Sequence, residues 1–306
     1  MKARLIEDGG AAASDPEHFF RSPPFLTAER VTHTVAVEGD RDLRLPVIVR
    51  PIESSERRDA ISPYGYPGAT EAFREPPDPT GIDWSETGLV SVFVRDRIGD
   101  DASFAGGTVR SHVHVADGDG GIRKRLREQI RRNVRHGWSV EFSPPGEASE
   151  WARTAFERAY AQTMARARSA GRYLYPSEYF EILLRSERSW LLLAARDRTP
   201  LAGAIAVASD GYLHYYLGGT ADEALVDSPM KNLFAAMISL GGELGTPVNL
   251  GGGITPGDSL DEFKRGFANG DAPFRTHEVT CDRAAYERLV AESAPAPKGF
   301  FPTYRA

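Results

Sequence analysis

The second half of the chain alternates strand-like runs with helical segments, and this order strongly restricts the folds that it can form. Short apolar runs bounded by turn residues predict three strands, at 190–196, 202–208 and 212–219. A helical apolar stripe follows over 230–244, with Ser228 as its N-cap and Pro229 at the first helical position. Gly245 ends that helix, and a further strand and helix follow. This order predicts an α/β or α+β fold with mixed sheets flanked by helices.

The first third of the chain has a different texture, with many prolines and short alternating segments. Three of these segments predict strands, at 43–51, 89–96 and 109–115. Longer helical segments begin near residue 121. We therefore predict two domains, a smaller one over 1–120 and a second over 121–290, with the tail 291–306 packing on the first.

The composition is that of a globular protein. Hydrophobic residues make up 41% of the 306 residues, which is enough to bury a full core. The apolar runs are too short to cross a bilayer, and the first residues contain no apolar stretch that could act as a signal peptide. The single cysteine, Cys281, cannot form an internal disulfide, which indicates a reducing compartment. We expect a cytoplasmic protein.

Charge is distributed unevenly along the chain. The net charge of −6 excludes a general nucleic-acid binder, but the segment 121–137 carries seven basic residues and one acid, Glu128. The basic residues are Arg123, Lys124, Arg125, Arg127, Arg131, Arg132 and Arg135. A cationic helix on an acidic protein indicates a local anionic partner. A solvated helix face explains the same pattern, and on this feature alone it is the preferred interpretation.

The sequence VNLGGGITPGDSLDEFKRGFA, residues 248–268, places three glycines after a short apolar run. It is not a nucleoside-triphosphate loop, because Asp258 stands where such a loop needs lysine. The glycines indicate a strand-to-helix turn, with Asp258 or Ser259 as the helix N-cap. The apolar face of that helix consists of Leu260, Phe263 and Phe267. Lys264 lies beside this face, and spacing alone favours a lysine that extends to solvent over one held at the rim of a cleft.

No metal site or hydrolase motif is predicted. His112 and His114 lie two residues apart on a predicted strand, and their alternation explains them without a metal. The chain has no G-x-S-x-G motif and no cysteine–histidine pairing typical of a hydrolase.

Several motifs occur in the same order as in one known family. SPYGYPG (62–68), RRNVRHGWSV (131–140) and the tyrosine–threonine–arginine segment 160–180 are followed by HYYLGGT, SPMKNLF, NLGGG, DSL and FKRGF, and FFPTYR lies close to the last residue. Over more than two hundred residues this series resembles the Fem-type (FemABX-like) transferases of the GNAT acyltransferase superfamily. The resemblance implies two GNAT-like lobes with a substrate cleft between them.

The resemblance also implies an activity. Fem-type enzymes form amide bonds by moving an aminoacyl group from aminoacyl-tRNA to an amine of a peptide, a peptidoglycan precursor or a natural-product intermediate. Negative charge grows on the carbonyl oxygen during this reaction, and a cation placed there stabilises the transition state. The family match assigns this role to Lys264. Asp258 is a second catalytic candidate that would orient the lysine or take the amine proton, although a helix cap is the simpler interpretation.

Further site residues follow from the same resemblance. The expected substrate-binding residues are Arg166, Tyr173, Tyr215, Tyr216, Tyr64 and Tyr66. Because Tyr215 and Tyr216 alternate on one strand, only one of them is expected to face the cleft. His214 shares the face of Tyr216 and is interpreted as a packed or hydrogen-bonded core residue. The expected tRNA-binding residues are Arg127, Arg131, Arg132 and Arg135.

The acyl donor is the main open question. Acyl-CoA-dependent GNAT enzymes hold pyrophosphate with R/Q-x-x-G-x-G/A, and the corresponding segment 221–232 has no such glycines and is acidic. We therefore expect no cofactor, with aminoacyl-tRNA as co-substrate. An acyl-CoA-dependent N-acyltransferase and a non-catalytic binding protein are the two alternatives. The composition favours a specialised pathway such as antibiotic biosynthesis over cell-wall synthesis.

Overall fold

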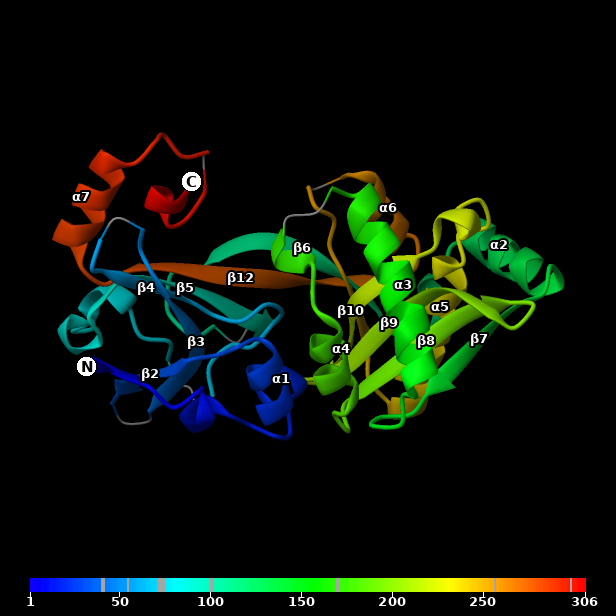
Figure 1. The fold of residues 1–306 in the computed structure, drawn as a ribbon, viewed down its shortest axis with the longest axis horizontal. Helices are drawn as coiled ribbons and strands as arrows, with labels where there is room; N and C mark the ends of the chain where they lie inside the picture. Colours follow the sequence, from blue (N-terminus) through cyan, green and yellow to red (C-terminus); the bar gives the residue numbers. More distant parts are fainter. Residues whose placement is uncertain are drawn as a thin grey trace. The chain divides into compact units, whose positions relative to one another are not determined.

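The computed structural model describes residues 1–39, 42–53, 55–70, 75–99, 102–168, 171–255, 257–297 and 299–306. The chain divides into two compact units (Figure 1). Unit 1 consists of Met1–Arg110 and Pro273–Ala306, and unit 2 of Ser111–Ala272. Residues 273–290, which the sequence analysis placed in the second domain, therefore group with unit 1. Residues 273–280 belong to a strand that pairs with residues before 100, and the helix after it packs on Val90.

Unit 1 is built on a mainly antiparallel sheet. In spatial order its strands are β1 (Lys2–Ile6), β2 (His33–Glu38), β3 (Leu43–Pro51), β4 (Arg58–Ile61), β5 (Leu89–Ile98) and β12 (Gly270–Thr280). β4 and β5 are parallel, and the other pairs are antiparallel. Buried valines and leucines from these strands form the core, and α1 (Pro23–Ala28) and α7 (Arg283–Glu292) complete the unit.

The strands of unit 2 have a mixed arrangement. In spatial order its strands are β6 (Thr108–Ala116), β11 (Val248–Gly251), β10 (Tyr212–Thr220), β9 (Thr199–Ser209), β8 (Ser189–Arg196) and β7 (Trp138–Ser143). β10 and β11 are parallel, and the other pairs are antiparallel. The three strands predicted from apolar runs are present as β8, β9 and β10, and the mixed α/β fold class is confirmed.

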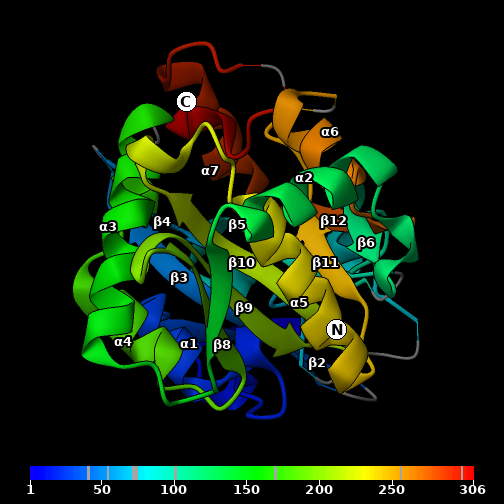
Figure 2. The same cartoon turned by 90° about the vertical axis from the view of Figure 1, so that its right-hand side faces the viewer.

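Helices cover both faces of the unit 2 sheet (Figure 2). They are α2 (Lys124–Arg135), α3 (Glu150–Arg166), α4 (Ser177–Leu184), α5 (Met230–Leu244) and α6 (Ser259–Arg265). On β9, a Cβ on Gly203 would collide with Phe156 of α3, whereas Ala202 and Ala204 pack in the core cluster that includes α5. Because successive strand residues face opposite ways, α3 and α5 lie on opposite faces of this sheet.

The ends of α5 show one confirmed prediction and one correction. Gly245 ends the helix in the left-handed conformation, with φ of 67°, as predicted. The helix begins at Met230, so Pro229 is the N-cap, one residue later than predicted. Ser228 instead adopts a positive φ of 51° and makes no side-chain cap bond. Among the described helices, none has both the length and the apolar character needed to cross a membrane.

Candidate active site

The two parallel strands of unit 2 are irregular at the same level. β10 and β11 pair at Leu213–Val248 and at His214–Asn249, and no further pairing between them occurs among the described residues. Just beyond these pairs, each strand has an irregularity against its other neighbour, at Tyr215 in β10 and before Gly251 in β11. Such bulges redirect side chains and end strand pairing. Tyr215 and the glycine-rich turn therefore lie where the two strands stop pairing.

Glycine is required in the turn after β11. Gly251 has a φ of 75°, and a Cβ at this position would lie 2.9 Å from Nζ of Lys264. At Gly253 a Cβ would lie 2.5 Å from Oδ1 of Asp258. These glycines let the backbone pass close to the first and last turns of α6, so they have a packing reason in addition to a conformational one.

Lys264 is buried at this turn. Its residue is 7% exposed, and Nζ donates a hydrogen bond of 2.8 Å to the carbonyl oxygen of Gly252. Nζ also lies 5.4 Å from the centroid of the Tyr215 ring, within cation–π range. Burial lowers the pKa of Lys264 to about 8, and the nearby carboxylates of Asp258 and Asp261 oppose this shift. Spacing alone had favoured a side chain that extends to solvent, and this interpretation is wrong. The catalytic role of Lys264 stays a prediction.

Asp258 forms the N-cap of α6. Its carboxylate accepts backbone N–H bonds from Asp261 at 2.8 Å, Ile254 at 2.8 Å and Thr255 at 2.9 Å. These backbone bonds lower the pKa of Asp258, chiefly those from Thr255 and Asp261. The helix-cap interpretation is confirmed. A lowered pKa makes the carboxylate a weaker base, so the proposed part in proton transfer stays a prediction with less chemical support.

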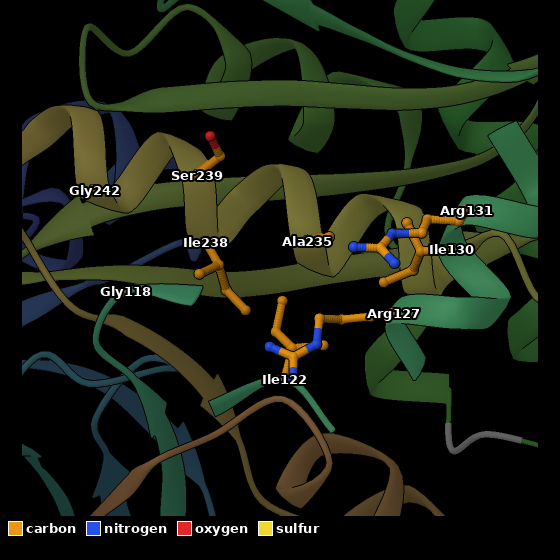
Figure 3. A pocket seen from close by; sticks show the side chains of 9 residues that line it. All are labelled: Gly118, Ile122, Arg127, Ile130, Arg131, Ala235, Ile238, Ser239 and Gly242. Carbon is orange, nitrogen blue, oxygen red and sulfur yellow. The ribbon is translucent and has the colours of Figure 1, made fainter. Parts of the chain in front are cut away.

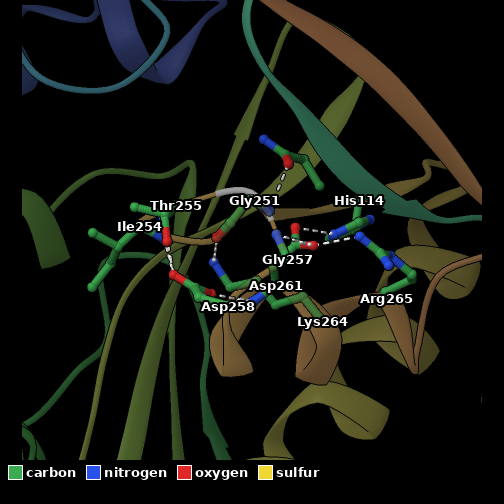
Figure 4. A network of polar contacts seen from close by, with 11 residues as sticks. His114, Gly251, Ile254, Thr255, Gly257, Asp258, Asp261, Lys264 and Arg265 are labelled. Carbon is green, nitrogen blue, oxygen red and sulfur yellow. Dashed lines mark hydrogen bonds and ion pairs between the residues drawn. The ribbon is translucent and has the colours of Figure 1, made fainter.

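A buried contact between a histidine and a carboxylate, which the sequence analysis did not identify, lies beside Lys264 (Figure 4). Nε2 of His114 and Oδ1 of Asp261 are 2.7 Å apart, and both side chains are about nine-tenths buried. Oδ2 of Asp261 also pairs with Arg265 and accepts the N–H of Gly257 at 3.2 Å. The hydrogen bond from His114 is the main cause of the lowered pKa of Asp261. Asp261 thus connects β6, the turn and α6.

One local signal could have indicated part of this network. Asp261 precedes Lys264 by three residues and Arg265 by four, the spacings at which helical side chains meet. His114 gave no such signal, because it lies 147 residues before Asp261 and reaches it only through the pairing of β6 with β11. The alternation argument placed both histidines on one strand face, but His112 is exposed and His114 is buried.

The two tyrosines of β10 have different surroundings. Tyr215 faces Lys264 and packs edge-on against Phe234 with ring centroids 4.9 Å apart. Burial raises the pKa of Tyr215 to about 12, so the phenol stays neutral. The hydroxyl of Tyr216 instead lies 2.7 Å from that of Tyr179. Only Tyr215 therefore contacts the lysine. Its substrate-binding role, like that of Tyr216, stays a prediction.

His214 is a hydrogen-bonded core histidine, as predicted. Nε2 lies 3.0 Å from the carbonyl oxygen of Ser209, and Nδ1 accepts a bond of 2.9 Å from the amide of Asn249. Burial lowers the pKa of His214 to about 4, so the ring is neutral near pH 7. The same Asn249 accepts the N–H of Gly251 through its amide oxygen, at 2.8 Å. His214 thus supports the turn without contributing a charge.

The expected acceptor contacts lie elsewhere in unit 2. The guanidinium of Arg166, at the end of α3, pairs with Asp222 and donates to the carbonyl oxygen of Thr220 at 2.8 Å. The carbonyl oxygen of Tyr173 accepts a bond of 2.9 Å from the hydroxyl of Tyr160. These contacts account for the local positions of Arg166 and Tyr173 within the fold. Their roles in substrate binding stay predictions.

Tyr64 and Tyr66 belong to unit 1, whereas Lys264 belongs to unit 2. The N–H of Tyr64 donates to Glu29 at 2.9 Å, and the ring of Tyr66 packs edge-on against Phe20 at 5.5 Å. Gly65 between them has a φ of 104°. The loop is therefore a turn packed by its own neighbours, and a part in substrate binding stays a prediction.

The basic segment forms α2, with its arginines exposed. All four expected tRNA-binding residues are exposed: Arg127, Arg131, Arg132 and Arg135. None of the four pairs with a carboxylate in the part of the chain that the structure describes. Leu126 and Ile130 pack on the core from the opposite side. The N–H of Arg123, the N-cap of α2, donates to the carbonyl oxygen of Gly266 at 2.9 Å, which ties the helix to the end of α6.

Comparison with known proteins identifies the fold. Residues 120–265 match the family described as acetyltransferase (GNAT) domain. No curated protein matches the chain. Among solved structures, FemX has 12% identity and a TM-score of 0.57, with 83% of this chain and 89% of FemX covered. The C-terminal domain of a putative lysylphosphatidylglycerol synthetase from Agrobacterium fabrum has 12% identity and a TM-score of 0.54, with 92% and 95% covered. The protein therefore has a fold like that of FemX, and residues 120–265 are similar to a GNAT acetyltransferase domain.

Proposed function

We propose that the protein is an acyltransferase that forms an amide bond by moving an aminoacyl group from aminoacyl-tRNA to an amine. The amine nitrogen bonds to the ester carbonyl carbon, the ester C–O bond breaks, and the amine proton ends on the departing ribose hydroxyl. The acceptor is an amine of a peptide, a peptidoglycan precursor or a natural-product intermediate. The observation that supports this proposal most directly is the buried ammonium group of Lys264 at the turn after β11.

The surroundings of Lys264 suit stabilisation of a carbonyl oxyanion. Its only hydrogen bond within the described residues is to Gly252, which leaves two of its three N–H donors without a protein partner there. The carbonyl of Gly252 and the ring of Tyr215 fix the ammonium position without neutralising its charge. A positioned cation in a site of low water content stabilises developing negative charge far more than one in bulk water.

The basic helix supports tRNA as the donor. Arginines on an exposed helix neutralise backbone phosphates, with an affinity that depends on salt and little on sequence. The backbone bond from Arg123 to Gly266 places the start of α2 beside the end of α6, because Gly266 follows Lys264 by two residues. An RNA held on α2 would therefore be held beside the helix that carries the proposed catalytic cation.

An acyl-CoA donor is the second candidate, and two observations favour it. The matched family is described as an acetyltransferase domain. In addition, Lys231 in the first turn of α5 has a pKa lowered by burial and by the nearby Arg132 and Arg125, so cations gather close to a helix N-terminus that favours anions. The lack of pyrophosphate-binding glycines in 221–232 argues against this donor.

A donor-consumption assay tests the proposal. The full chain is incubated with a peptide-amine library and either a pool of radiolabelled aminoacyl-tRNAs or acetyl-CoA. We expect label to move from tRNA to an amine product, with no thiol released from acetyl-CoA. Thiol release without dependence on charged tRNA would establish the acyl-CoA alternative instead. Consumption of neither donor would favour the non-catalytic binding protein.

A further inference from the structure

A groove lies between α2 and α5 in unit 2, apart from the turn that holds Lys264 (Figure 3). Its volume is about 440 Å³, within the range of small-molecule pockets. Ile122, Ile130, Ala235 and Ile238 provide apolar lining, and Gly118, Ser239 and Gly242 add small residues. The sequence analysis assigned no site to these residues. The groove thus combines an apolar surface with an adjacent basic helix.

Two arginines give the groove its charge. Arg127 and Arg131, one helical turn apart on α2, extend their guanidinium groups toward the groove (Figure 3). No carboxylate side chain is among its lining residues, and neither arginine pairs with a carboxylate within the described residues. A ligand that matches this groove has an anionic group beside a flat, largely apolar group. Nucleotides have this combination, because the flat base buries apolar surface against aliphatic side chains while the phosphate binds arginine.

We propose that the groove binds one unpaired nucleotide of the RNA donor, with its phosphate on Arg127 and Arg131 and its base against the isoleucines. This inference rests on the proposed function and extends it to a specific subsite. RNA is preferred over a free nucleotide because the cationic surface continues along α2 through Arg132 and Arg135, beyond the groove. A polynucleotide can cover both the groove and this surface, whereas a mononucleotide fills the groove alone.

The test uses the full chain and two uncharged RNA hairpins that share one duplex. One hairpin ends in a short single-stranded 3′ overhang and the other is blunt. We expect the overhang to increase affinity about tenfold, because one base becomes buried against the isoleucines. Changing both Arg127 and Arg131 to glutamine should weaken binding of both hairpins and reduce the slope of log affinity against log salt by about 2.

Filling the groove isolates the base contribution. Gly242 lies in α5 and lines the groove, and a Cβ there would meet no atom within 4 Å, so a side chain can begin at this position without a collision. Gly242→Leu should abolish the preference for the overhang and leave blunt-hairpin affinity unchanged. Glu243→Leu puts the same side chain on the next, exposed residue outside the groove lining and should retain the preference.

Three outcomes would overturn the assignment: equal affinity for both hairpins in the unaltered protein, an overhang preference that survives Gly242→Leu, or displacement of the overhang hairpin by coenzyme A at the groove. Failure of the proposed function is distinguished by the separate transfer assay. Overhang binding that Gly242→Leu removes, without aminoacyl transfer, would retain the groove and refute the activity. Aminoacyl transfer that Gly242→Leu does not affect, in a protein with no overhang preference, would support the activity and refute the groove assignment.

Discussion

Lys264 is held between a carbonyl oxygen and an aromatic ring, and both contacts bear on how it would act. Burial disfavours the protonated amine, the nearby carboxylates of Asp258 and Asp261 favour it, and the net result is a pKa lowered to about 8. The group is therefore mostly charged near pH 7. A cation with a moderately lowered pKa can stabilise an oxyanion and still lose its proton within the range accessible to kinetics.

Replacing Lys264 by alanine tests its role directly. We expect kcat to fall by about 10²–10³, the usual effect of removing one group that stabilises an oxyanion. The midpoint of thermal unfolding should change little, because the substitution also removes a buried charge. Lys2→Ala, which removes a half-exposed lysine in unit 1, should leave kcat unchanged. Full turnover in the Lys264→Ala protein would refute the catalytic role.

The pH dependence of the rate carries a second prediction. Only protonated Lys264 stabilises negative charge, so kcat/KM should fall as pH rises through about 8. In Lys264→Arg the guanidinium stays charged, and any remaining activity should lose this decline up to at least pH 10. Profiles of kcat/KM for both proteins measure the effect. An unchanged decline in the arginine variant would assign it to another group.

At the scale of elements, the turn between β11 and α6 is the part that most constrains the site. Asp258 caps α6, Asp261 anchors it to His114 on β6, and Gly251 lets the backbone approach the lysine. These contacts come from two strands and one short helix. A helix of seven residues is marginal alone, so these anchors hold α6 in place more than its own propensity does.

Gly251→Ala should disturb both the turn and the lysine. The positive φ disfavours alanine by about 1–2 kcal/mol, and its Cβ would lie 2.9 Å from Nζ of Lys264. Gly245→Ala is the matched control, because φ is also positive there and a Cβ would meet no atom within 4 Å. Denaturant unfolding should show a loss in both variants. Only Gly251→Ala should lower kcat, and equal rates in the two would argue against a functional contact at this glycine.

The exposed face of α2 carries a prediction about the donor. Changing Arg131, Arg132 and Arg135 to glutamine should weaken tRNA binding and flatten its dependence on salt, with a slope reduced by about 3. Folding should be preserved, because the side of α2 that packs on the core is formed by Leu126 and Ile130. Filter binding of tRNA over a salt series measures the slope. Unaltered affinity and turnover with charged tRNA would count against this surface.

At the scale of the whole molecule, the sequence predicted individual strands and helices better than it predicted which elements contact one another. The strands β8 to β10 and the helix α5 follow from apolar periodicity, which is a local property of the chain. The grouping of residues 273–290 with unit 1 does not, since it depends on the pairing of β12 with β5. Likewise, spacing alone left Lys264 in solvent, because its burial depends on Gly252 and Tyr215 from two other elements.

The backbone bond from Arg123 to Gly266 links two parts of unit 2 to which different roles are assigned. It joins the N-cap of the basic helix to the C-cap of the helix that carries the lysine, and Leu126 packs against the same glycine. The proposed RNA-binding surface and the ammonium group are thus joined through a shared backbone contact. A substitution that breaks this contact should therefore weaken both the proposed RNA binding and the proposed catalysis, although it changes neither the arginines nor the lysine.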